Sequence, residues 1–168
     1  MLDEPRLLAA NAWVTRRPIT VSEHHRMGEV GILGERDRIE LIEGGERARV
    51  SVQNPVRLDD FNEPGPDFAL LKPRPDSYRD AHPRPADVLV LIEVADTSLN
   101  YDRAVKPALY ARHAIPEFWI IDLTSGEVEV CLDPQPDGYG TLKRVGRDGV
   151  LEAALLPGVR IPLATLFR

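Results

Sequence analysis

Two carboxylates in the middle of the chain stand where they could share one cation. Asp67 leads a short apolar segment, residues 68–71, and Glu93 follows the unbroken apolar run 88–92. A run of aliphatic residues without alternation is typical of a strand that is covered on both faces. If these two strands are neighbours, Asp67 and Glu93 converge at one edge of the sheet, where they repel each other unless a cation or a shared proton holds them. Because oxygen ligands favour hard cations over zinc, the pattern predicts a Mg²⁺ or Mn²⁺ site.

A lysine follows the central strand and could complete this site. Lys106 lies on the segment 101–111. Residues 96–100 precede it and supply N-cap candidates, so the pattern predicts a helix there. From that helix the ammonium could swing toward the metal. Pro107 interrupts the pattern, because proline removes a backbone donor and clashes with the preceding turn. The helix is therefore expected either to kink at Lys106 or to begin afresh at Pro107.

The remaining apolar segments predict the strands that position these residues. Residues 38–43 alternate between polar and apolar, as a half-buried strand does, and residues 118–122 form a second apolar run. Residues 127–132 and 141–145 are typical of antiparallel strands, with residues 133–138 as the turn between them. We expect a mixed central sheet with helices, which is an α/β fold.

Length and composition bound the class of protein. The chain has 168 residues, of which 43% are hydrophobic and 29% are charged, and this is typical of one soluble domain over residues 1–168. We expect residues 1–18 to form a short helix or an N-terminal arm. The formal net charge of −6 argues against a simple DNA-binding module, since such modules are usually basic. It argues less against a nuclease, whose acidic metal site is neutralised by the bound cation.

Cysteine content and hydropathy narrow the setting. A single cysteine, Cys131, excludes an intrachain disulfide and cannot by itself form a zinc cluster. We expect it to be a buried strand residue. No apolar run approaches the ~18 residues that cross a bilayer, and Asp3 and Glu4 stand where a signal peptide would be basic. We therefore expect a cytoplasmic protein without a membrane partner.

An ordered set of segments resembles a known family. The set runs Pro66-Asp67, Leu91-Ile92-Glu93-Val94-Ala95-Asp96-Thr97-Ser98, Asp102-Arg103 with Lys106, Leu109-Tyr110-Ala111, and Ile115 to Asp122. These segments resemble the Uma-type restriction endonuclease family of the PD-(D/E)XK nuclease superfamily. In the usual superfamily motif the lysine stands two positions after the second acid, where this chain has Ala95. The family takes its lysine from the following helix, which matches Lys106.

The resemblance implies a fold and a chemistry. The implied fold is a restriction-endonuclease-like mixed central sheet with flanking helices. The implied activity is that of a metal-dependent endonuclease-like phosphodiesterase acting on DNA, in which Asp67, Glu93 and the backbone carbonyl of Val94 hold Mg²⁺ or Mn²⁺. Lys106 would orient the attacking water or stabilise negative charge on the phosphate. The family's further acidic residue corresponds to Glu40, which is equally consistent with a solvent-facing strand position.

One departure from the family pattern follows Gly45. A block large enough for a strand and a helix is absent there, so one core helix that covers a sheet face is expected to be missing. Apolar sheet that is left bare needs another cover, such as a second subunit, and we therefore expect a homodimer. The same departure, together with Pro107, supports an alternative function as a catalytically inactive relative that serves as a dimeric interaction module.

Two further features have a structural and a functional interpretation. Residues 72–85 are rich in proline and carry Arg74, Arg79 and Arg84, so they form either a phosphate-contacting arm or a plain solvated loop. Trp119 lies among apolar neighbours, which favours a core position over a base-stacking one.

Overall fold

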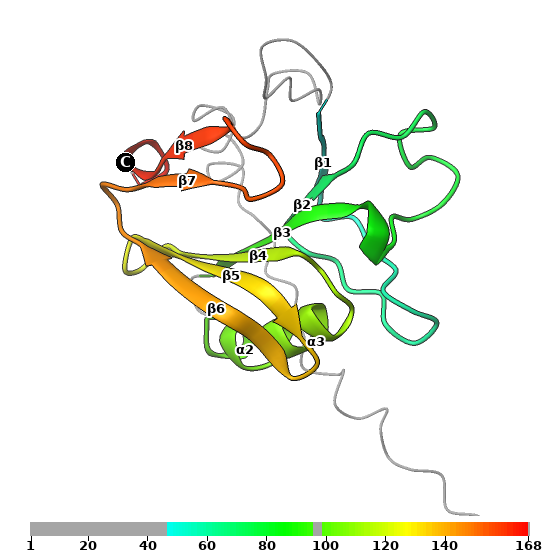
Figure 1. The fold of residues 1–168 in the computed structure, drawn as a ribbon, viewed down its shortest axis with the longest axis horizontal. Coiled ribbons are helices and arrows are strands. Elements are labelled where there is room, and N and C mark those ends of the chain that lie inside the picture. The colour runs from blue at the N-terminus through cyan, green and yellow to red at the C-terminus, as the bar shows by residue number, and fades with distance from the viewer. Residues whose placement is uncertain (1–46, 96–98, 168) are drawn as a thin grey trace, which may run out of the picture.

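A six-stranded sheet organises the described part of the chain, which in this computed structural model comprises residues 47–95 and 99–167 (Figure 1). Its strands stand in sequence order: β1 (Arg49–Val52), β2 (Phe68–Leu71), β3 (Val88–Ala95), β4 (Glu117–Asp122), β5 (Glu127–Gln135) and β6 (Gly138–Val145). Helices α2 (Leu99–Ala104) and α3 (Lys106–Arg112) connect β3 to β4, and a second sheet pairs β7 (Val150–Glu152) with β8 (Arg160–Pro162). Short 3₁₀ helices occupy Pro85–Asp87 and Leu163–Thr165.

β3 is the buried strand that the unbroken apolar run predicted. All eight of its residues are buried. The strand pairs antiparallel with β2 and parallel with β4. Because parallel neighbours cannot be joined by a tight turn, the chain crosses from β3 to β4 through α2 and α3. The expected mixed α/β sheet is confirmed.

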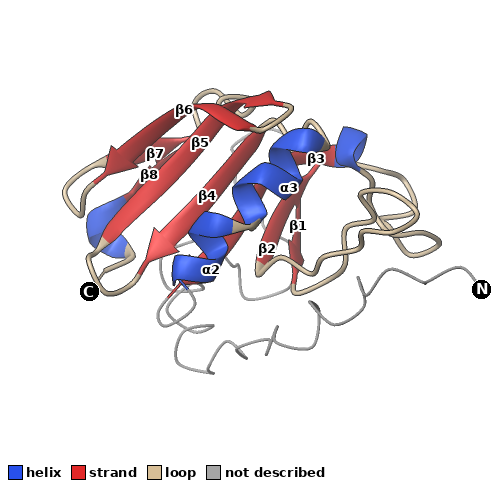
Figure 2. Cartoon of the chain, turned by 90° about the horizontal axis from the view of Figure 1, so that it is seen from below, coloured by secondary structure: helices blue, strands red, loops and turns tan. Residues whose placement is uncertain are grey.

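The two faces of the main sheet are covered by different parts of the chain (Figures 1 and 2). Alternate side chains of each strand point to opposite faces. On one face, α3 contributes Tyr110 to a hydrophobic cluster that includes Phe118 of β4. On the other face, Leu151 of β7 and Leu163 of the C-terminal 3₁₀ helix belong to a second cluster with Trp119. Trp119 is thus a core residue, as its neighbours in the sequence favoured.

The second cluster shows what covers the face of the main sheet opposite α3. Within the described residues, the small sheet and the segment after it cover that face, and every residue of β3 and β4 is buried. A second subunit is therefore not required to bury these two strands. Gly45, the expected strand 38–43 and the expected arm 1–18 lie outside the described residues. The missing helix and the homodimer stay predictions.

The hairpin between β5 and β6 differs from the turn expected over residues 133–138. β5 continues to Gln135, which pairs with Gly138, so only Pro136 and Asp137 form the turn. Pro134 had suggested an earlier end to the strand. β4 pairs with β5 only as far as Leu132, so β5 has a single partner strand at Pro134 and tolerates proline as an edge strand does.

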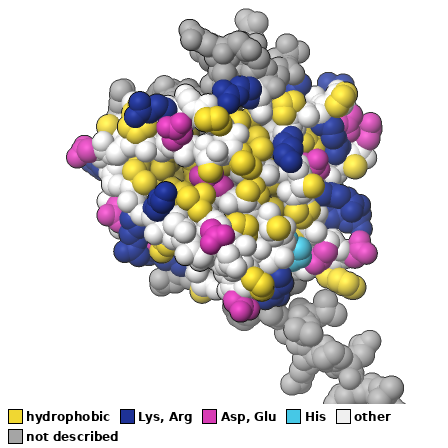
Figure 3. All heavy atoms as spheres, viewed as in Figure 1, with side chains coloured by type: hydrophobic (Ala, Val, Ile, Leu, Met, Phe, Trp, Pro, Cys, Tyr) yellow, Lys and Arg dark blue, Asp and Glu magenta, His cyan; other side chains and the backbone are white. Residues whose placement is uncertain are grey.

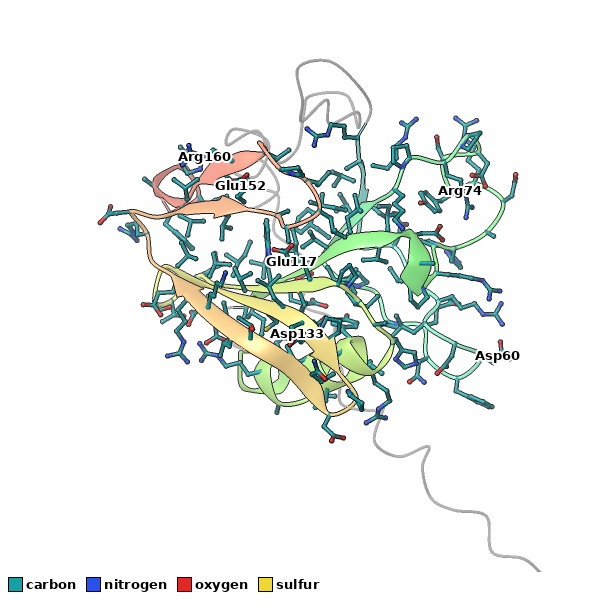
Figure 4. The ribbon with its side chains drawn as sticks, in the orientation of Figure 1. Asp60, Arg74, Glu117, Asp133, Glu152 and Arg160 are labelled. Carbon is teal, nitrogen blue, oxygen red and sulfur yellow. The ribbon has the colours of Figure 1, made fainter. Side chains whose placement is uncertain are left out.

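The proline-rich loop 72–85 is irregular, but its first arginine is held within it. Arg74, labelled at the rim of Figure 4, contacts Asp76 through two nitrogens at 2.5 and 2.7 Å. Its guanidinium also donates to the carbonyl of Ala81 at 3.0 Å and lies 4.1 Å from the ring centroid of Tyr78. Arg74 therefore organises the loop, and only exposed residues such as Arg84 remain candidates for a phosphate contact.

Cys131 is buried on β5, as expected. No helix within residues 47–95 and 99–167 is long and apolar enough to cross a membrane.

Candidate active site

The pairing of β2 with β3 brings Asp67 to Glu93. Phe68 pairs with Ile92 in the antiparallel ladder, so the residue before Phe68 lies opposite the residue after Ile92. Asp67 is held there at both ends, because its carbonyl accepts from the Gln53 N–H at 2.9 Å and its Oδ2 accepts from the Val94 N–H at 2.8 Å. The predicted convergence of the two carboxylates is present in the structure.

A break between α2 and α3 places Lys106 at the start of a helix. Val105 is the N-cap of α3, and Pro107 lies in its first turn. A proline is tolerated there, since the first N–H groups of a helix have no intrahelical partner. The chain therefore begins a new helix, as one of the two expected arrangements required, and it does so at Lys106 rather than at Pro107.

Lys106 joins the two carboxylates that flank it. Its Nζ lies 2.8 Å from Oε2 of Glu93 and 2.8 Å from Oδ1 of Asp102. The lysine side chain is 19% exposed, whereas both carboxylates are buried. The ammonium thus reaches Glu93 as the sequence predicted, and it does so from a position that solvent still touches.

Sequence reasoning missed Asp102 and Tyr110 as parts of this cluster. The Tyr110 hydroxyl donates to Oε1 of Glu93 at 3.1 Å. Asp102, Lys106 and Tyr110 follow one another at intervals of four residues, which places side chains on one face of a helix. This four-residue spacing is the pattern from which both residues could have been predicted, whereas Pro107 indicated only a break in the helix.

The cluster has strongly perturbed ionisation. Burial raises the pKa of Glu93 to about 8, against the opposing effect of the Lys106 ammonium, and the negative charge of Asp67 acts in the same direction as burial. Burial also raises the pKa of Asp67 above its ordinary value, although the Val94 N–H opposes this. Burial lowers the pKa of Lys106, but Glu93 and Asp102 outweigh it and leave the pKa raised. Two adjacent carboxyls thus favour protons until a cation replaces them.

The donor set is suited to a hard divalent cation that also binds substrate. No group of three or more His, Cys, Asp or Glu side chains in the described ranges forms a metal cage by itself. Mg²⁺ is commonly held by one or two carboxylates with waters and substrate phosphate oxygens completing its shell, which Asp67 and Glu93 can provide. In an extended strand the N–H and C=O of a residue point to the same side, so the Val94 carbonyl faces the side of Asp67. Glu40 lies outside the described residues, and its role stays a prediction.

A second polar cluster lies on the same sheet face and was not foreseen. Glu129 of β5 accepts from Arg103 at 2.8 and 3.0 Å and from Arg144 at 3.1 Å. Asp122 lies 3.6 Å from Arg103 and accepts from two backbone N–H groups of the turn after β4. This network joins α2 to β4, β5 and β6.

The opposite face of the main sheet carries a further buried carboxylate. Glu117, labelled near the middle of Figure 4, accepts from the Trp119 indole at 2.6 Å and from the Ala154 N–H at 2.8 Å. Both donors are uncharged, and the bond from Ala154 ties β4 to the C-terminal segment. Figure 3 shows hydrophobic side chains gathered near the centre of the face seen in Figure 1, with acidic and basic side chains intermixed around them.

Comparisons with known proteins agree with the fold and with the sequence resemblance. The family model Uma2, described as "Putative restriction endonuclease", matches residues 23–164. A crystal structure of a "putative nuclease belonging to DUF820" from Anabaena variabilis is similar, with a TM-score of 0.58 and 15% sequence identity over 90% of this chain and 83% of that chain. No curated protein matches the chain. The restriction-endonuclease-like fold is therefore confirmed.

Proposed function

The chain belongs to the Uma2 family, and on that premise we propose that it is a metal-dependent phosphodiesterase that cleaves DNA. The observation that carries the proposal is the meeting of Asp67, Glu93 and Lys106, with the lysine 2.8 Å from Glu93. The family's description and the nuclease described for the similar crystal structure both support a nuclease-like function.

The two carboxylates and the Val94 carbonyl would hold Mg²⁺ or Mn²⁺. Such a cation polarises a phosphoryl oxygen and lowers the pKa of a bound water. Asp67 is pre-oriented for this role by the Val94 N–H. Binding requires ionised ligands, so it displaces the protons that burial favours on Asp67 and Glu93.

Lys106 is the cationic side chain of the proposed site, in addition to the bound metal. Its ammonium donates to Glu93 and Asp102, and three donors allow one to remain for a water or a phosphate oxygen. The partial exposure of the lysine leaves it accessible to substrate. In this position it can orient the attacking water or stabilise negative charge as it develops on the phosphate.

A thermal melt with and without Mn²⁺ tests the metal site. At ten times the dissociation constant, Mn²⁺ should stabilise the wild-type protein by about 1.4 kcal/mol, or roughly 3 °C. Glu93→Gln should melt cooperatively and show no shift, because it removes the negative charge of one of the two carboxylates that would hold the cation. Plasmid cleavage in the presence of Mn²⁺ should be abolished in the same variant.

Glu117→Gln is the matched control for this experiment. It replaces another buried glutamate of the same sheet, on the opposite face and bound only to uncharged donors. It should lower the melting temperature while retaining the Mn²⁺ shift. Equal Mn²⁺ shifts in the wild type and Glu93→Gln, or undiminished cleavage by Glu93→Gln, would contradict the proposal.

A second candidate function is favoured by the edge that β6 forms in the main sheet of the described residues. β6 is its last strand and has Leu142 55% exposed, and an edge strand is a template for pairing with another chain. A catalytically inactive relative that acts as a dimeric interaction module fits this feature. Sizing chromatography at micromolar concentration distinguishes the candidates, since a monomer that shows the Mn²⁺ shift leaves only the nuclease.

A further inference from the structure

Glu93 is held by two side chains of α3, one for each carboxylate oxygen. Lys106 contacts Oε2 at 2.8 Å, and the Tyr110 hydroxyl donates to Oε1 at 3.1 Å. The two donor residues lie about one helical turn apart, so α3 sets the relative positions of their backbones. A carboxylate held at both oxygens has a defined plane and rotamer.

The ring of Tyr110 is fixed by packing, which makes its hydroxyl a rigid donor. Tyr110 is fully buried and packs edge to face with Phe118 at a centroid distance of 4.9 Å. Its hydrophobic cluster also includes Val56, Leu58 and Ile115. Burial and the nearby Glu93 raise the pKa of Tyr110 well above its ordinary value, so the phenol stays protonated and acts as a hydrogen-bond donor.

A buried tyrosine needs a hydrogen-bond partner for purely structural reasons as well. Tyr139, which packs against the same cluster, has a hydrogen bond of this purely structural kind. Its ring stacks on Phe118 at 6.4 Å, and its hydroxyl donates to the backbone carbonyl of Ile115 at 2.9 Å. Tyr110 differs in its acceptor, because it donates to a proposed metal ligand where a backbone carbonyl would have satisfied it equally well.

We propose that Tyr110 is a positioning residue for the metal site, which orients Glu93 from the side opposite Lys106. The inference rests on the proposed function, since it assigns Glu93 as a ligand. Hydrogen-bond partners of metal ligands fix the orientation of the ligand, and their removal commonly weakens metal binding by about 10- to 100-fold.

The experiment measures the Mn²⁺ dissociation constant at one fixed pH for the wild type, Tyr110→Phe and Tyr139→Phe. Both variants remove one hydrogen-bonded hydroxyl and keep the ring, Tyr110 within the cluster and the partly buried Tyr139 against it, so both should lower the melting temperature of the metal-free protein. Tyr110→Phe should weaken Mn²⁺ binding at least tenfold. Tyr139→Phe should leave the dissociation constant within about twofold of the wild type, since its partner is not a proposed ligand.

The outcomes separate the inference from the function on which it rests. Wild-type binding that Glu93→Gln abolishes and Tyr110→Phe leaves within twofold would overturn the positioning role alone. Equal weakening by the two tyrosine variants would overturn it as well, because a general loosening of the cluster would then be sufficient. Absence of a Glu93-dependent Mn²⁺ response in the wild type would overturn both. If Tyr110→Phe does not melt cooperatively, Tyr110→Met, which is adaptable and also lacks the hydroxyl, replaces it.

Discussion

Glu93 on β3 and Glu129 on β5 are buried on the same face of the main sheet, yet their surroundings differ in kind. Both are aligned with Ile120 of the intervening strand. Glu129 is held by Arg103 and Arg144. Glu93 has another carboxyl, Asp67, beside it and a lysine and a tyrosine as its donors.

The difference separates a fixed network from one that can change its protonation. Arginine does not lose its proton in proteins, so the charges around Glu129 are permanent and hold α2 to the sheet. At Glu93 a pKa of about 8 leaves the carboxyl ready to exchange a proton for a cation near neutral pH. Consecutive residues of α2, Asp102 and Arg103, contribute to the two clusters. One helix therefore serves both an anchor and a candidate reactive site.

The largest expected effect on stability comes from breaking the anchor. Glu129→Gln removes the buried charge that two arginines share, and removing one partner of a buried ion pair is strongly destabilising. Because both arginines still reach solvent, we expect a loss at the low end for such pairs, about 3 kcal/mol, or roughly 9 °C. Thermal melts measure this, and the Mn²⁺ shift should survive. A variant as stable as the wild type would remove the distinction between the clusters.

A smaller effect is expected in the pH dependence of stability. The pKa of Glu93 rises from 4.5 to about 8 on folding, so its stabilising contribution is complete below pH 4.5 and is lost as the pH rises to 8. Glu93→Gln lacks this loss. The difference in unfolding free energy between the two proteins should therefore change in favour of the variant as the pH rises from 5 to 8. Urea titrations of both proteins across this pH range test the sign of the change. A difference in unfolding free energy that stays constant with pH would contradict the prediction.

The smallest effect is expected at the rim of the anchor. Arg144 is 61% exposed and shares Glu129 with Arg103, which makes two contacts to it. Arg144→Ala should cost less than about 1 kcal/mol, as is usual for exposed ion pairs, and the cost should shrink in high salt. A loss as large as that of Glu129→Gln would show that the two arginines act as one unit.

Those parts of the site that depend on strand pairing could be predicted from the sequence. The unbroken apolar run located β3, and the short segment after Asp67 paired with it in the register that brings Asp67 to Glu93. Asp102 and Tyr110 were missed because Pro107 directed attention to the helix break, although their four-residue spacing from Lys106 survives it. A periodic pattern reports which face a side chain takes, whereas the partner it meets there depends on how the helix is placed on the sheet.

The small sheet shows why the rest of the fold was harder to predict. β7 and β8 have three residues each, which is too short for alternation to be recognised. Their role as a cover of the main sheet was therefore not foreseen. At Pro134 the error was the opposite one, since β5 was predicted to end too early. Proline is tolerated there because β4 has already ended and β5 has only one neighbouring strand.

The loop that carries Asp67 is closed at its base and open at its tip. The Gln53 N–H to Asp67 carbonyl bond closes the base, and Val56 and Leu58 are fixed in the core, while Phe61 at the tip is 95% exposed. Lengthening a loop costs little once its ends are fixed, about 0.6 kcal/mol for each doubling. The tip can therefore vary in length and composition while Asp67 at the base keeps its position. The surface that the tip presents can thus change without a change at the candidate active site.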